Sequence, residues 1–347
     1  MLNKKNTWTP SLFRDYRNAE HDACGIVSVM EKRKIATKEN IDLCIQSLVK
    51  MNHRAGFING EGDGIGIHID IPKTLWNEKL KSSGYNPTIV DHPHFIVGHF
   101  FLNKKENITA LKDYIRTQLN NKNFTIIFES DDATNSDALG PLGKQEEPLF
   151  WQVALIAENE IINIEQTLFS VTIKIEENEA IHVASLSHDH VVYKVLGAGD
   201  TLVAYYNDLQ HPLIASTMTL GHNRYSTNTL SNFFRVQPFS ILGHNGEINT
   251  IAKLRDQAEM IDVPLTAGGS DSQDLNRTLE TLLVQYGYSL FEAMEILFPP
   301  IINEIKLYET PLQDLYTYIR EAWGHFAQGP AGIISRFKDE AVFSVDS

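Results

Sequence analysis

The sequence predicts a mixed α+β fold, because strand patterns lie at both ends of the chain and helical patterns fill most of its last third. Residues 24–30 and 64–71 carry an apolar run or a strict alternation near the start, and strand patterns return at 332–336 and 341–345. We expect strands that are this far apart in the sequence to share sheets. The chain should therefore fold as one intertwined domain and not as two consecutive ones.

The other elements follow from apolar spacing and capping residues. Thr37 is a candidate N-cap for a helix whose apolar face includes Cys44, and Ser289 with Glu292 forms a capping box for another helix. Further helices are expected at 108–119, 270–286 and 311–326. Further strands are expected at 94–101, 124–129, 149–157, 169–175, 182–185 and 191–196, with a loop over 131–147.

Composition excludes several classes of function. A net charge of −14, from 44 acidic and 30 basic residues, leaves no basic stripe for a nucleic acid backbone. The two cysteines are too few for a disulfide framework or a thiolate zinc site, which fits a reducing cytosol. The longest apolar runs, such as 95–102, are far shorter than the roughly 20 residues of a membrane span. Residues 1–23 are polar and lack the apolar stretch of a signal peptide. We expect a soluble, cytoplasmic protein without a membrane partner.

Cys24 is the first candidate for chemistry. A cysteine that opens an apolar strand is commonly a small buried hydrophobic residue. If the chain were cleaved before Cys24, however, the residue would carry a free α-amino group with a pKa near ~8, and this amine could act as the base for its own thiol. Ala23 and Gly25 are small enough to leave room for such a cleavage.

Three further polar clusters each allow a structural and a functional interpretation. Arg224 could bind a carboxylate through its planar guanidinium, or it could form a surface ion pair. Asn245 and Gly246 could be an ordinary hairpin turn, or their amide groups could donate to an oxyanion. Ser270, Asp271 or Ser272 could simply cap the helix that follows, or Asp271 could hold a substrate ammonium group.

Two other patterns are weaker. His188 and His190 would lie on one face of a strand and form a possible metal pair, but no further ligands stand at a diagnostic spacing. The glycines of 60–66 precede a strand and not a helix, which is the wrong context for a phosphate-binding loop. We expect no metal.

Taken together, the clusters resemble one family, the class II glutamine amidotransferase domain, and most closely the N-terminal domain of the glutamate synthase large subunit. The resemblance runs from Glu20 to the end of the chain. It rests on six motifs in family order: His21-Asp22-Ala23-Cys24-Gly25-Ile26, His53-Arg54-Ala55-Gly56, Gly62-Asp63-Gly64, His222-Asn223-Arg224-Tyr225-Ser226-Thr227-Asn228-Thr229, His244-Asn245-Gly246-Glu247-Ile248-Asn249-Thr250 and Ser270-Asp271-Ser272.

The resemblance implies a role for each candidate residue. Cys24 would be the nucleophile that attacks the side-chain amide of L-glutamine. Arg224 would bind the α-carboxylate, Asp271 the α-ammonium group, and Asn245 with Gly246 the oxyanion. The alternatives are a different cysteine amidohydrolase of the N-terminal-nucleophile type and a regulatory module that binds an amino acid without turnover.

The resemblance also implies the architecture and the partners. The fold would be a four-layer αββα sandwich of two mainly antiparallel sheets. Residues 1–23 would be a leader, and 24–347 would be the amidotransferase domain, truncated at its C-terminal end. A synthase domain or subunit would receive the ammonia, and the FMN and the iron–sulfur cluster of glutamate synthases would belong to that part, leaving no cofactor in this domain.

Overall fold

The computed structural model describes residues 24–157, 161–224, 232–266, 268–322 and 331–346, together with residues 327 and 329. The fold is mixed α+β, and every strand pairing within the described residues is antiparallel. The expectation of an α+β fold with antiparallel sheets is confirmed. Instead of the two sheets expected, however, the described strands form two four-stranded sheets, a three-stranded sheet and a two-stranded ribbon.

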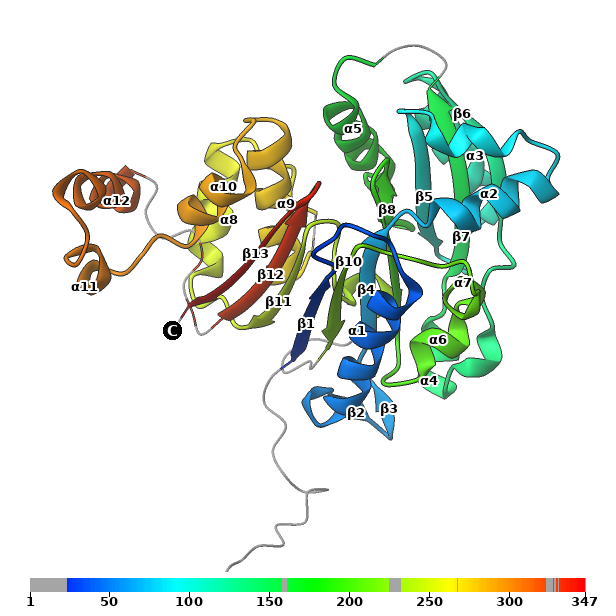
Figure 1. Cartoon of the computed structure of the whole chain (residues 1–347), viewed down its shortest axis with the longest axis horizontal. Helices are drawn as coiled ribbons and strands as arrows, with labels where there is room; N and C mark the ends of the chain where they lie inside the picture. The colour runs from blue at the N-terminus through cyan, green and yellow to red at the C-terminus, as the bar shows by residue number, and fades with distance from the viewer. Residues whose placement is uncertain are drawn as a thin grey trace, which may run out of the picture.

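Each sheet combines strands from distant parts of the chain (Figure 1). The central sheet has the order β1 (Gly25–Met30), β10 (Met218–Asn223), β4 (Ile65–Asp70) and β9 (His190–Val195). The outer sheet has the order β6 (Phe124–Ser130), β7 (Leu149–Ala157), β5 (Phe95–Leu102) and β8 (Ile181–Ser187). The three-stranded sheet consists of β11 (Leu242–Gly246), β12 (Ala331–Phe337) and β13 (Glu340–Asp346), and the ribbon of β2 (Phe57–Ile58) and β3 (Glu61–Gly62).

The described helices lie between these strands along the chain. The longer ones are α1 (Lys38–Lys50), α2 (Lys73–Ser82), α3 (Ile108–Asn120), α5 (Ile164–Glu176), α8 (Ile251–Met260), α9 (Asp271–Val284), α10 (Leu290–Leu297) and α12 (Thr310–Ala322). The shorter ones are α4 (Pro141–Glu146), α6 (Thr201–Tyr205), α7 (Asn207–Gln210) and α11 (Ile302–Ile305), with 3₁₀ turns η2 (Asn52–Arg54), η3 (Pro87–Asp91), η4 (Ser136–Ala138) and η5 (Phe233–Arg235).

Helices bury the sheets in three apolar clusters. The first joins α1 to the central sheet and to part of β5 and β7, and the second packs α3 and α5 on the outer sheet. The third packs α8, α9 and α10 on the three-stranded sheet. The strands β1 and β10 also contact β11 or β12, so the central and three-stranded sheets lie against each other (Figure 1).

Helix α1 lies very close to β10, because Gly221 has no side chain. A methyl group at Gly221 would come within 2.6 Å of the Sγ of Cys44 and 2.9 Å of a methyl carbon of Leu48. Both of these residues are fully buried on the inner face of α1. Thr37 caps the helix as predicted, because its side chain accepts a hydrogen bond from the backbone N–H of Asn40 at 3.2 Å.

The predicted local structure is wrong in two segments before residue 180. Residues 169–175 were expected to form a strand, but they belong to α5, which Asn163 caps. The segment is rich in β-branched and aromatic residues, yet helical spacing places Leu168, Val171 and Ile175 on one buried face against the outer sheet, so packing overrides intrinsic propensity. The expected loop over 131–147 contains η4 and α4.

Candidate active site

Cys24 and Arg224 are brought together by the pairing of β1 with β10. Gly25 pairs with Asn223, so the residue before β1 lies beside the residue after β10. Cys24 is half-buried, and Arg224 is buried. Two polar residues 200 positions apart in the sequence thus meet at one end of the central sheet.

The guanidinium of Arg224 lies within electrostatic range of three acidic groups. Burial lowers the pKa of Arg224 from its ordinary value, while the charges of Asp63, Cys24 and Asp271 act in the opposite direction. An arginine stays protonated at any physiological pH. The site therefore has a fixed cation within electrostatic range of both the thiol of Cys24 and the carboxylate of Asp271.

Backbone hydrogen bonds fix the position of Arg224. Its N–H donates to the carbonyl oxygen of Gly64 at 2.8 Å, and its carbonyl accepts from the N–H of Gly56 at 2.9 Å. One guanidinium nitrogen also donates to the carbonyl oxygen of Arg235 at 2.7 Å. The rest of the predicted arginine motif, residues 225–229, lies outside the described residues.

Asn245 and Gly246 are the last two residues of β11. They pair with Gly332 and Ala331 of β12. Gly246 is exposed and has φ of 122°, a conformation that favours glycine, whereas Asn245 is partly exposed and is not among the residues with positive φ. The chain therefore leaves the sheet at Gly246, with the side chain of Asn245 at the strand end.

The hairpin interpretation of this Asn-Gly pair is wrong. The described chain places a tight Asn-Gly turn elsewhere, at Asn59 and Gly60 between β2 and β3, where φ is 53° and 85°. Two successive positive φ values are typical of the two-residue turn that joins antiparallel strands. The oxyanion role of Asn245 and Gly246 stays a prediction.

His244, next to Asn245, is the centre of a buried hydrogen-bond cluster. Its carbonyl oxygen accepts from Nε2 of His222 at 2.9 Å and from Nε2 of Gln237 at 3.2 Å, and its N–H donates to Oε1 of Gln237 at 2.7 Å. Its Nδ1 lies 2.9 Å from Oγ of Ser272. Burial lowers the pKa of His222 to about 3, so this ring is neutral and carries its proton on Nε2.

Asp271 begins α9 and is held by the helix start itself. Ser270 is the N-cap and forms a capping box with Gln273. Oδ1 of Asp271 accepts from the N–H of Ser272 at 2.7 Å and lies 3.3 Å from its Oγ. Ser270, which caps α9, and Asp271, which is within electrostatic range of Arg224, therefore occupy the same helical turn.

A model of the class-II glutamine amidotransferase family matches residues 24–343. This match covers most of the chain. The chain belongs to the class-II glutamine amidotransferases. Proteins similar to this chain include glutamate synthases. The amidotransferase is 28% identical to the NADH glutamate synthase of Saccharomyces cerevisiae, over 90% of this chain and 16% of that protein. It is 29% identical to the chloroplastic ferredoxin-dependent enzyme of Spinacia oleracea, over 90% of this chain and 21% of that one.

A third relative is ferredoxin-dependent glutamate synthase 2 of Synechocystis, with 27% identity over 95% of this chain and 23% of that protein. The amidotransferase chain thus spans about a fifth of the length of these relatives. Within its described residues, no helix is long and apolar enough to cross a membrane.

The amidotransferase also has a cavity of about 620 Å³ that none of the five predicted site residues lines. Its walls come mainly from α5, β8, α9 and residues 232–241.

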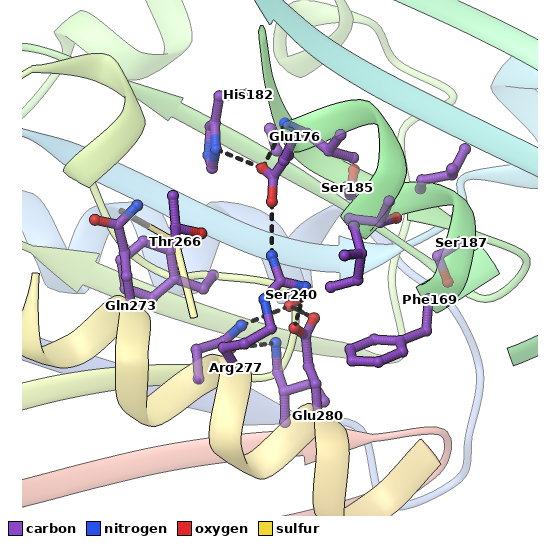
Figure 2. Close-up of a pocket in the computed structure, with 18 of the residues that line it drawn as sticks. Phe169, Glu176, His182, Ser185, Ser187, Ser240, Thr266, Gln273, Arg277 and Glu280 are labelled. Carbon is purple, nitrogen blue, oxygen red and sulfur yellow. Dashed lines mark hydrogen bonds and ion pairs between the residues drawn. The ribbon is translucent and has the colours of Figure 1, made fainter. Parts of the chain in front are cut away.

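Buried ion pairs line this cavity. As Figure 2 shows, Glu176 bridges His182 and Arg277, at 2.9 Å and 2.6 Å, and Arg277 also contacts Glu280 at 2.9 Å. Burial would raise the pKa of Glu176, but the hydrogen bond from His182 and the charge of Arg277 hold it at about 2. We interpret the ion pair between Glu176 and Arg277 as a link between the helices α5 and α9.

The described residues of the amidotransferase hold no group of three His, Cys, Asp or Glu side chains that could bind a metal ion. His188 and Asp189 lie in the bend between β8 and β9, so the expected strand at these positions is wrong. The ring of His190 contacts Asp189 at 2.6 Å and stacks on His68, with ring centres 4.3 Å apart. These contacts account for His190 without a metal.

Proposed function

We propose that this amidotransferase hydrolyses the side-chain amide of L-glutamine to glutamate and ammonia, with Cys24 as the nucleophile. The observation that carries the proposal is the electrostatic proximity of Cys24, Arg224 and Asp271. A cation and an anion in the neighbourhood of a thiol match the α-carboxylate and α-ammonium groups of a free amino acid. A peptide, which has neither group beside an internal glutamine, would be excluded.

The chemistry requires a base for the thiol. We propose that residues 1–23 are removed, so that the α-amine of Cys24 accepts the thiol proton. The thiolate then attacks the amide carbon, and the tetrahedral intermediate collapses when the amine returns the proton to the leaving nitrogen, which departs as ammonia. Water, deprotonated by the same amine, attacks the γ-glutamyl thioester, releasing glutamate and restoring the thiol.

Asn245 and Gly246 would stabilise the oxyanion of both tetrahedral intermediates. The side-chain amide of Asn245 and the N–H of Gly246 are donors at the end of a strand, where the backbone is held by β12. Donors fixed before the reaction need no reorganisation when the negative charge develops, which is why such groups lower a barrier strongly. Arg224 and Asp271 would orient the substrate so that its amide carbon faces Cys24.

We further propose that four layers form an αββα sandwich of the N-terminal-nucleophile type. The contacts of α1 with β1 and β10, of these strands with β11 or β12, and of α9 and α10 with β11 and β13 support that order. On the similarity to glutamate synthases, the ammonia would pass to a synthase domain or subunit, and any flavin or iron–sulfur chemistry would belong there.

The proposal is tested by comparing the two cysteines. Protein whose N-terminus at Cys24 has been verified by intact mass should release ammonia from glutamine. Cys24→Ala should abolish this release, whereas Cys44→Ala should retain it, because Cys44 is buried on the inner face of α1. If the verified protein bound glutamine but released no ammonia, a regulatory module would be favoured. Faster release from an amide other than glutamine would favour a different amidohydrolase.

A further inference from the structure

The edge of β11 that faces away from β12 is held by a side chain. Neighbouring residues of an antiparallel strand direct their backbone groups to opposite edges. His244 is opposite Ile333 in β12, but its N–H and carbonyl oxygen bond to Gln237, at 2.7 Å and 3.2 Å, and not to Ile333. The backbone groups of Asn245, one residue further on, therefore face β12.

The primary amide of Gln237 thus replaces a neighbouring strand. Its Oε1 accepts and its Nε2 donates, which is the pair of hydrogen bonds that an adjacent peptide unit would supply. Gln237 is buried, with 6% of its surface exposed, so water competes little for either bond. The bonds are made at the residue directly before Asn245, and they fix the direction in which β11 ends.

The same amide also reaches the start of α9. Nε2 of Gln237 lies 3.3 Å from Oγ of Ser272, and that oxygen lies 2.9 Å from Nδ1 of His244. The N–H of Ser272 in turn donates to Asp271 at 2.7 Å. One buried side chain therefore contacts both the strand that carries the proposed oxyanion donors and the helical turn that carries the proposed ammonium-binding carboxylate.

We propose that Gln237 is a positioning residue that keeps Asn245 at a fixed distance from Asp271. The proposal rests on the function proposed above. A glutamine molecule held by its α-ammonium group presents its amide at a fixed distance from Asp271, so the oxyanion donors must keep the same distance. Displacement of a catalytic group by about 1 Å costs on the order of 100-fold in rate.

The test compares Gln237→Met with a matched variant of another buried glutamine. Gln152 in β7 is fully buried and bonds to Lys79, His99 and Asp208, none of which is a proposed site residue. Gln237→Met should lower kcat for glutamine by about 10- to 100-fold and change KM by less than about threefold. Gln152→Met should lower the melting temperature and leave kcat unchanged. A Gln237→Met protein with normal kcat and only a lower melting temperature would overturn the proposal.

Hydrogen exchange supplies a readout that needs no turnover. In Gln237→Met the backbone amide of His244 should exchange faster than in the unsubstituted protein, since it loses its acceptor, and the change should extend to Asn245 and Gly246. Unchanged exchange at these three amides would overturn the positioning role whatever the kinetics show. If the unsubstituted protein hydrolyses no glutamine, the proposed function fails, and the exchange data still decide the role of Gln237.

Discussion

The substitution Asn245→Ala separates the contribution of this residue to catalysis from its contribution to folding. Asn245 is partly exposed, its backbone pairs with Gly332, and its side chain makes no hydrogen bond to another described residue. Alanine adopts strand conformation, so the pairing is retained, and the stability should change by no more than about 0.5 kcal/mol. Loss of an oxyanion donor should raise the activation barrier by about 2.7–4 kcal/mol, a 10²- to 10³-fold loss of kcat.

Steady-state glutaminase kinetics and a melting curve on the same preparation provide the measurement. KM should change little, because the donor acts mainly in the transition state. Asn245→Asp is the sharper comparison, since it keeps the shape of the side chain, removes the N–H donors and adds a negative charge, and it should be at least as inactive as the alanine variant. Turnover within about threefold of normal in Asn245→Ala, with an intact fold, would refute the oxyanion role.

Three further predictions concern substrate binding, thiol reactivity and acid stability. Arg224→Lys should raise KM for glutamine by about tenfold or more, because a point charge replaces a planar fork; an unchanged KM would contradict carboxylate binding. In the folded protein a thiol reagent should label Cys24 and spare Cys44, since burial raises the pKa of the Cys44 thiol, and intact mass before and after unfolding would reveal the opposite pattern. Glu176→Gln should reduce the free energy of unfolding on the order of 3 kcal/mol near pH 7, because the pKa of Glu176 is lowered to about 2. That difference should fade as the pH falls from about 4.5 towards 2, and urea unfolding at several pH values would detect a difference that fails to fade.

Helices that begin with a recognisable capping residue could be predicted well from the sequence. Ser289 begins a helix with a capping box, as the sequence indicated, and Ser270 is one of the three residues expected to cap the helix α9, because such interactions are local. The segment 169–175 could not be assigned correctly from its residue types. Its β-branched side chains suit a strand, and only the outer sheet beneath α5 makes the helical face the better one.

The site was predictable to the extent that its groups stand in recognisable motifs. Arg224 and Asp271 were both candidates from the sequence, and they lie within electrostatic range of each other in the structure. Gln237 was not a candidate, since a single glutamine in a loop carries no pattern, and only the fold brings it near its partners in β11 and at Ser272. The hairpin interpretation of Asn245 and Gly246 failed for a different reason. The same dipeptide can close a hairpin, as at Asn59, or end a strand, as at Asn245.

The close approach of α1 to β10 has a consequence for how this amidotransferase can vary. The space beside Gly221 is filled by Cys44, so positions 221 and 44 share a single volume. A larger residue at one position can be accommodated only with a smaller residue at the other, and the two substitutions should show strong epistasis when combined. Because Arg224 lies three residues beyond Gly221, an uncompensated enlargement at either position would also shift the arginine. If Arg224 binds the substrate as proposed, sequence changes on the inner face of α1 are thereby constrained by substrate recognition.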